Sequence, residues 1–320
     1  MGVPQGSILG PLFFLIYIND LAMVSPLLRC ILFADDTNLF VKSKTRDNLY
    51  KLANSELEKF FKWVSLNKLT LNHNKTEYIE FTKSNPPQST PPLLINNHQI
   101  RKVQESKFLG VLIDSRLSWR SHIQKLTSKI SQTIGIIGRA RVFMDSTQLK
   151  LLYNTMVLPH LQYCLINWGN FKACSNIKFG KKILTLQKCL VRIVDGAPRL
   201  SHADPLFFSQ NSLKIEDLYE QSVRMFAFKL FKNITPDEIA NFFPKTTHSH
   251  NTRSAKSNLF VERADPRSIK FIIPRCWNSL PKEMKQATSI AAFKNMSKSS
   301  LLAPYGRFTC QEKRCPSCLV

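Results

Sequence analysis

Glycine and long apolar runs are both scarce in this chain of 320 residues. Only 10 residues are glycine and 17 are proline, whereas 43% are hydrophobic. These proportions argue against a disordered or fibrous chain, because there is enough apolar surface to offset the entropy lost on folding. No apolar run reaches the ~20 residues that a membrane-spanning helix needs. The length therefore predicts one large globular domain or two ordinary ones, with no membrane segment.

Basic residues are missing ahead of Arg29, and this bears on the apolar run from Ile8 to Ile18. The run resembles the hydrophobic core of a signal peptide. A signal peptide, however, has basic residues before that core and small residues at its cleavage site. Here Asn19 and Asp20 follow the run instead. The sequence thus predicts no signal peptide, and we expect an intracellular protein of the cytoplasm and nucleus.

Acidic residues are also few, and they are unevenly distributed. The chain has 45 Lys and Arg against 22 Asp and Glu, a net charge of +23. Residues 1–113 contribute +4 (13 basic, 9 acidic), and residues 114–320 contribute +19 (32 basic, 13 acidic). Such an excess predicts a polyanionic partner rather than a small acidic substrate. The alternative is a solvated basic surface that aids solubility.

Most of the eight cysteines stand singly in apolar surroundings, as reduced core thiols do, so we expect no disulfide framework. The exceptions are Cys310, Cys315 and Cys318 near the end of the chain. A closed zinc site needs four ligands, and this cluster offers three. A fourth ligand would have to come from a distance, from His250 or Cys276. Free thiols or an incomplete zinc knuckle are the alternatives to a zinc site.

Residues 1–114 are predicted to form an α+β layer of helices and short strands. Helices are expected over 11–21 and over 45–66, the second with Thr45 as its N-cap and with apolar residues at helical spacing. Between them, residues 30–41 (CILFADDTNLFV) place two acids between apolar runs, which is the pattern of a β-hairpin. Strands are then expected at 76–82, 93–96, 98–103 and 107–114.

Beyond Asp114 the apolar spacing becomes helical. Apolar residues at helical spacing between Trp119 and Ile137 form one stripe. No acidic residue lies between Asp114 and Asp145. The basic residues lie largely outside the stripe, and they are Arg116, Arg120, Lys125, Lys129, Arg139 and Arg141.

Later helices are expected at 146–158, ended by Pro159, at 173–194 and at 213–232. The composition changes near 114–118 and turns polar near 245–255. These changes predict three regions, 1–114, 115–245 and 246–320.

Asp35 and Asp36 are adjacent carboxylates at the tip of the predicted hairpin, where they repel each other. A divalent metal ion would offset this repulsion, because carboxylate oxygens are ligands that magnesium prefers. Nucleotidyl transfer uses two such ions about 4 Å apart, held by shared carboxylates. The alternative is an ordinary Asp-Asp-Thr turn without metal, since Asp is common in turns.

Four segments resemble, in order, successive motifs of reverse transcriptases: GVPQGSILGPLFF (2–14), FADDT (33–37), WVSLNKLTLNHNKTEYIEF (63–81) and FLGVLID (108–114). The resemblance is closest to the enzymes of non-LTR retrotransposons of the jockey-like, LINE type. A later segment, CWNSLPKEMKQATSIAAFKNM (276–296), is similar to the end of such reading frames. The resemblance therefore spans nearly the whole chain.

This resemblance implies the C-terminal half of a right-hand polymerase palm in 1–114, a helical thumb and connection region in 115–245, and a basic tail region with a Cys-rich end in 246–320. It implies an RNA-directed DNA polymerase that uses an RNA template, a DNA primer, deoxynucleoside triphosphates and two magnesium ions. The basic residues of the thumb would contact template and primer phosphates. A solvated basic helix is the alternative.

Carried over by position, the resemblance implies that Asp35 binds both magnesium ions and that Asp36 is the weaker partner. Lys75 would approach the triphosphate and offset charge on the leaving pyrophosphate. The implied substrate-binding residues are Gly2, Pro4, Gln5, Gly6, Ala34, Phe108, Leu109 and Gly110. The segment Phe108–Gly110 resembles a primer grip. The alternatives are a mere tight turn at Gly2–Gly6 and a β-bulge at Phe108–Gly110.

The family pattern includes a third carboxylate on a strand ahead of the GVPQG motif, and this chain begins at that motif. We therefore expect little or no polymerisation from the 320 residues alone. We interpret the chain as a piece of a longer or decayed element. The alternative function is that of a non-catalytic nucleic-acid-binding relic of such an element.

Overall fold

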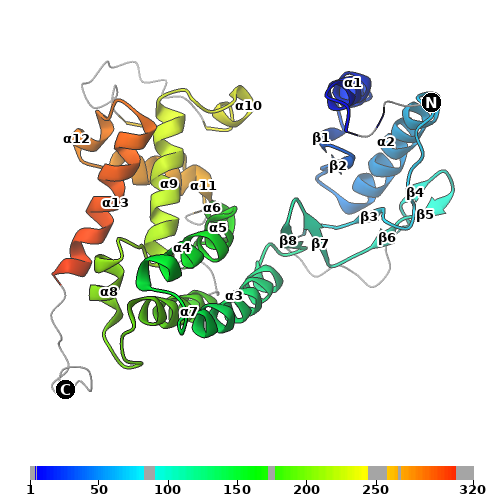
Figure 1. Ribbon diagram of the computed structural model, residues 1–320. Coiled ribbons are helices and arrows are strands. Elements are labelled where there is room, and N and C mark those ends of the chain that lie inside the picture. Colours follow the sequence, from blue (N-terminus) through cyan, green and yellow to red (C-terminus); the bar gives the residue numbers. More distant parts are fainter. Residues whose placement is uncertain are drawn as a thin grey trace, which may run out of the picture. The chain divides into compact units, whose positions relative to one another are not determined.

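The computed structural model describes Pro4 and residues 6–82, 91–171, 177–243, 258–265 and 268–307 (Figure 1). The chain forms two compact units. The first unit comprises Met1–Ser106 and Asp114–Leu117, and the second comprises Lys107–Ile113 and Ser118–Val320. We term the second the helical unit, because its described elements are helices apart from the hairpin segment 107–113.

The first unit begins with a helix and a β-hairpin. α1 spans Leu9–Ile18 and continues as a 3-10 turn at Asn19–Met23, so the α-helix begins and ends earlier than the predicted 11–21. The predicted hairpin is present as β1 (Arg29–Phe33) and β2 (Asp36–Phe40), which pair antiparallel. Neither α1 nor any other helix in the described ranges has the length and apolar character needed to cross a membrane.

The long helix α2 holds the first unit together. It spans Arg46–Leu66, as its apolar spacing predicted. Thr45 is its N-cap residue, but the side chain is exposed and accepts no hydrogen bond, so the predicted capping interaction is wrong. The buried face of α2 contributes to two small cores, one shared with Ile95 and Ile100 and the other shared with the segment from α1 to β1.

The remaining strands of the first unit are very short. β3 (Glu77–Tyr78) pairs parallel with β6 (Arg101–Lys102), and β4 (Leu94–Ile95) pairs antiparallel with β5 (His98–Gln99). These strands are shorter than the apolar runs predicted, because pairing extends only over residues that meet a partner strand. A further pair, β7 (Glu105–Phe108) with β8 (Val111–Asp114), leads into the helical unit.

The helical unit differs from the prediction mainly around Pro159. This proline lies in the first turn of a new helix, where the missing N–H costs no hydrogen bond, so the preceding helix ends earlier than expected. The other two predicted helices are present, although residues 173–176 lie outside the described part. The helices are α3 (Arg120–Ala140), α4 (Ser146–Met156), α5 (Leu158–Gln162), α6 (Leu165–Trp168), α7 (Ile177–Asp195), α8 (Ala203–Ser209), α9 (Ile215–Phe231), α10 (Asp237–Ala240), α11 (Ile269–Asn278), α12 (Lys282–Lys285) and α13 (Ile290–Gly306).

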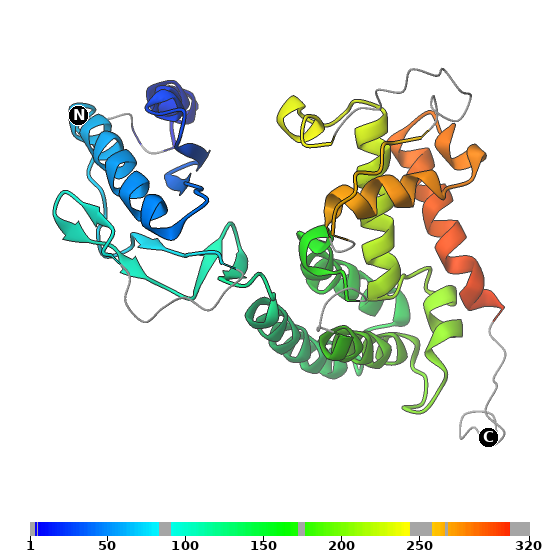
Figure 2. The same cartoon turned by 180° about the vertical axis from the view of Figure 1, so that it is seen from behind.

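Two apolar cores stabilise the helical unit. In the first, the predicted stripe of α3 is buried, with Ile123 and Ile137 fully inaccessible, and α3 packs along α7 (Figures 1 and 2). In the second, Trp277 of α11 is enclosed by residues of α9 and α13, and both views show these two helices side by side. The burial of the α3 stripe leaves the basic residues of that helix on its solvent side.

Candidate functional site

Asp35 and Asp36 lie at the tip of the β1–β2 hairpin. Phe33 pairs with Asp36, which leaves Ala34 and Asp35 as a two-residue turn. Ala34 has a positive φ of 51°. A turn with positive φ at its first central position usually has glycine there, because a Cβ is strained in that conformation. Both carboxylates are exposed, so the hairpin presents them to solvent from a short, fixed turn.

The hairpin is held on one side only. Cys30, Leu32 and Leu39 are partly buried against the core that α2 shares with α1. On the opposite side, Phe33 is 61% exposed and Phe40 is 43% exposed. The packed side fixes the position of the turn, and the open side leaves the aspartates accessible to a ligand.

Replacing Ala34 with glycine should stabilise the first unit by up to about 1 kcal/mol. Glycine relieves the positive-φ strain of about 1–2 kcal/mol, and its greater freedom in the unfolded chain offsets part of that gain. Urea unfolding followed by circular dichroism measures the change. Ala34→Val should act in the opposite direction, and equal stability of the two variants would contradict the strained turn.

The donor set at the hairpin matches part of a magnesium site. Two exposed carboxylates are ligands of the kind that magnesium takes together with water and substrate phosphates. Within the described residues, no group of three or more His, Cys, Asp or Glu side chains could hold a metal ion. The two aspartates therefore fit a site that needs further ligands from elsewhere to hold two ions.

Lys75 is exposed in the loop between α2 and β3. Its backbone N–H donates to the carbonyl of Asn72 over 3.1 Å, which closes a tight turn. In the described part of the chain, no hydrogen bond or ion pair joins Lys75 to Asp35 or Asp36. The structure thus exposes all three side chains without bringing the lysine into contact with the acids.

The segment before α1 contains a tight turn. The N–H of Ser7 donates to the carbonyl of Pro4 over 3.0 Å, and Gly6 has a φ of +92° that requires glycine. Pro4 and Gly6 are exposed. The other predicted residues of this motif, Gly2 and Gln5, lie outside the described residues, as do Cys310, Cys315 and Cys318 of the predicted zinc cluster.

Glu80 is the centre of a charge network that no motif or spacing in the sequence indicates. Its carboxylate accepts two hydrogen bonds from Arg46, at 2.6 and 2.8 Å, one from Lys102 at 2.6 Å and one from Tyr50 at 3.1 Å. The guanidinium of Arg46 contributes most to lowering the pKa of Glu80, to about 2. The network joins α2 to the β3–β6 region, so its role is structural.

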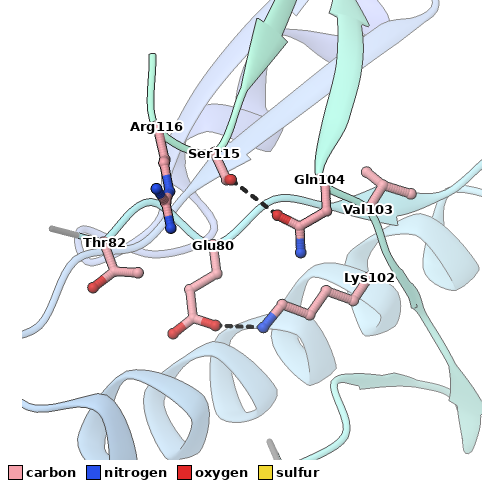
Figure 3. Close-up of a pocket in the computed structure, with 7 residues that line it drawn as sticks. All are labelled: Glu80, Thr82, Lys102, Val103, Gln104, Ser115 and Arg116. Carbon is pink, nitrogen blue, oxygen red and sulfur yellow. Dashed lines mark hydrogen bonds and ion pairs between the residues drawn. The ribbon is translucent and has the colours of Figure 1, made fainter. Parts of the chain in front are cut away.

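A small polar pocket of about 210 Å³ lies beside this network (Figure 3). Arg116, one of the predicted nucleic-acid-binding residues, lines it and belongs to the first unit. Figure 3 shows Ser115 hydrogen-bonded to Gln104 across the pocket and Glu80 paired with Lys102. The pocket does not include the aspartates of the hairpin.

The segment predicted as a primer contact is the turn of the β7–β8 hairpin. Leu109 and Gly110 both have positive φ, 43° and 89°, which defines a tight two-residue turn rather than a β-bulge. The hydroxyl of Tyr163 donates to the carbonyl of Leu109 over 2.5 Å. Its ring also lies in van der Waals range of a Cβ placed on Gly110.

His122 and Trp168 hold the same hairpin from α3 and α6. The N–H of Leu112 donates to Nδ1 of His122 over 3.4 Å. The ring of His122 meets the ring of Trp168 edge-on at 5.4 Å, and Nε1 of Trp168 donates to the carbonyl of Tyr163. Burial, assisted by Lys125, lowers the pKa of His122, which keeps its ring neutral and able to accept. Sequence reasoning missed these residues, because no spacing links them to the hairpin.

Tyr163→Phe should loosen the hairpin turn by about 1 kcal/mol, because it removes one hydrogen bond and keeps the ring. Amide hydrogen exchange at residues 110–112 should then be about fivefold faster. Exchange in α9 serves as the internal control and should not change. Unchanged exchange at the turn would show that the hydroxyl does not hold it.

The remaining predicted nucleic-acid-binding residues are all exposed. The list is Arg120, Lys125, Lys129, Arg139 and Arg141, all outside the buried stripe of α3. None of them forms an ion pair within the described ranges. The neighbouring helix α7 adds exposed lysines at 178, 181 and 182. Unpaired cations on two packed helices form a surface suited to phosphates.

Comparison with known proteins gives a consistent result. Residues 1–113 match the family described as reverse transcriptase (RNA-dependent DNA polymerase). The chain is 28% identical over 204 residues to the probable RNA-directed DNA polymerase from transposon X-element of Drosophila melanogaster, covering 61% of this chain and 22% of that protein. It is 25% identical over 250 residues to the RNA-directed DNA polymerase from mobile element jockey of the same species, covering 75% and 26%.

A third relative is the retrovirus-related Pol polyprotein from type-1 retrotransposable element R1 of Bradysia coprophila, at 25% identity over 59% of this chain and 19% of that protein. No solved structure matches the chain. The chain spans between 19% and 26% of the length of these curated relatives.

The segment 1–113, which contains the acidic hairpin, thus matches the reverse transcriptase class. Its relatives are RNA-directed DNA polymerases of non-LTR retrotransposons, which confirms the jockey-like, LINE-type resemblance seen in the motifs.

Proposed function

We propose that this chain takes part in RNA-directed DNA polymerisation for a non-LTR retrotransposon, as the second half of the palm followed by the thumb and a basic C-terminal region. The observation that carries the proposal is the pair of exposed aspartates at a fixed hairpin turn, inside a segment that matches reverse transcriptases. The substrates would be an RNA template, a DNA primer and deoxynucleoside triphosphates.

In this proposal Asp35, inside the turn, is the principal magnesium ligand, and Asp36, at the start of β2, is the weaker one. The ions, when bound, would activate the primer hydroxyl and stabilise charge on the triphosphate. The described residues provide two of the carboxylates. Polymerisation would therefore require further ligands from outside the described residues.

The other predicted residues have supporting roles in the proposal. Lys75 would neutralise the leaving pyrophosphate, and the turn at Pro4 and Gly6 would let the backbone approach the nucleotide. The β7–β8 turn would meet the primer. The basic surface of α3 would bind phosphates of template and primer, a contact that does not depend on base sequence and weakens with salt.

The decisive experiment joins this chain behind the preceding part of the jockey enzyme's polymerase domain and measures primer extension on RNA with magnesium. Asp35→Asn should reduce extension at least about a hundredfold, since it removes metal-mediated charge stabilisation worth several kcal/mol. Asp47→Asn, an exposed acid on the first turn of α2, is the matched control and should not change the rate. Extension that survives Asp35→Asn would refute the assigned role.

The second candidate is nucleic-acid binding without chemistry, and the +19 charge of residues 114–320 favours it. The 320-residue chain should then bind a primed RNA duplex with an affinity that falls linearly on a log–log plot against salt. An active fusion protein that depends on Asp35 supports polymerisation over this alternative. Salt-independent binding would contradict both.

A further inference from the structure

The turn between α3 and α4 displays two large apolar side chains to solvent. Val142 is 79% exposed and Phe143 is 87% exposed. The backbone beneath them is ordered, because the N–H of Phe143 donates to Ala140 over 2.9 Å and the N–H of Val142 donates to Arg139 over 3.5 Å. Phe143 is therefore exposed on a turn that backbone hydrogen bonds close.

A second loop lies beside this turn. The guanidinium of Arg141 donates to the carbonyl of Gly196 over 3.4 Å, just beyond the end of α7. In the same loop Arg199 is exposed, and Leu200 is 66% exposed. The two loops together carry three exposed apolar side chains and three arginines. We call this group the 142–200 patch, formed by Arg139, Arg141, Val142, Phe143, Arg199 and Leu200.

The net charge around the patch is positive. Asp145, the first acid after the turn, accepts from the N–H of Gln148 over 2.8 Å and caps α4, so its carboxylate is engaged at that helix. Asp195, the last residue of α7, is the other acid near the patch in sequence. Three arginines against these two acids leave a net charge of +1.

A group of exposed apolar side chains rimmed by polar residues marks an interaction site, whereas single exposed apolar side chains are common. An aromatic ring between arginines suits a partner that carries both anionic groups and flat rings. Arginines bind phosphates, and the aromatic ring stacks on a base. An acidic protein would provide charge but no regular flat apolar face. The combination on one turn therefore favours nucleic acid over protein.

We propose that the 142–200 patch is a nucleic-acid contact in which Phe143 packs against a base while Arg139 and Arg141 bind neighbouring phosphates. The inference rests on the proposed function insofar as the helical unit is taken to bind nucleic acid. It adds a base contact to the purely electrostatic surface of α3.

The test uses the 320-residue chain and a labelled RNA–DNA duplex with a single-stranded template overhang, with Kd measured by fluorescence anisotropy over a range of salt. Phe143→Ala should raise Kd about 5- to 150-fold, the range for loss of one base–aromatic stack, and should leave the salt slope unchanged. Phe143→Trp should restore binding. Arg139→Gln should instead reduce the slope by about 0.9, for one phosphate contact.

Ile234→Ala, which truncates a side chain that is 51% exposed after α9, is the matched control and should not change Kd. Salt-dependent binding that Phe143→Ala leaves within twofold of wild type would overturn this inference and leave the proposed function standing. If the wild-type chain does not bind the duplex, the nucleic-acid-binding part of the proposed function fails as well. A change in self-association without a change in Kd would instead identify the patch as an interface between copies, which also overturns the inference.

Discussion

Replacing Trp277 with alanine should lower the free energy of unfolding of the helical unit by about 3–5 kcal/mol. The side chain is completely buried at the meeting point of α9, α11 and α13. Its ring stacks on Phe231 at 4.6 Å and lies 6.2 Å from the ring of Phe293 and 6.4 Å from that of Phe228. Truncation would leave a large cavity that these rings can fill only in part. Urea unfolding followed by circular dichroism measures the loss.

Phe143→Ala provides a matched aromatic truncation for this measurement. Its ring is 87% exposed, so the free energy of unfolding should change by less than about 0.5 kcal/mol. A loss below about 1 kcal/mol for Trp277→Ala would contradict the packing described for this core. The result would also explain the tryptophan of the CWNSLP segment as a core residue of the helical unit.

Glu80→Gln should destabilise the first unit by about 2–3 kcal/mol, because Arg46 and Lys102 would lose the carboxylate that compensates both charges. The side chain of Glu80 is only 7% exposed, whereas the two cations are 23% and 26% exposed and retain some hydration. Amide hydrogen exchange in α2 should accelerate accordingly. Glu58→Gln, an exposed acid on the same helix, is the control and should have no effect.

The same network predicts how the first unit responds to acid. The pKa of Glu80 lies at about 2 in the folded chain, against an ordinary value of 4.5. A lowered pKa means that the folded state favours the carboxylate, so its contribution of roughly 3 kcal/mol is complete above about pH 4.5. It is lost as the pH falls from about 4.5 to about 2. Stability of α2 that is equally pH-dependent in Glu80→Gln would contradict this assignment.

Sequence periodicity predicted the elements whose contacts are local or follow one face. The stripe on α3 and the length of α2 followed from apolar spacing, and the hairpin followed from two apolar runs around Asp35 and Asp36. A tight turn could be expected there because Asp is common in turns. These features require little information from distant parts of the chain.

Contacts between distant side chains could not be predicted in this way. Glu80 meets Arg46 across 34 residues, and Tyr163 meets Leu109 across 54 residues. Strands of two residues, such as β3 and β6, are too short to show a period. At the candidate site, the motif around Lys75 predicts a role near the triphosphate. Lys75 is exposed in the structure, and none of its described contacts tests that role.

The position of the β7–β8 turn affects how the protein can be divided. The backbone passes between the units after Ser106, after Ile113 and after Leu117, since residues 107–113 belong with the helices. A single cut at Leu117 would therefore separate the turn from Tyr163 and His122, which hold it. A separately produced helical piece starting at Ser118 would expose their donor and acceptor atoms to water. Recombination that exchanges whole functional modules would have to carry the hairpin together with the helices that follow it.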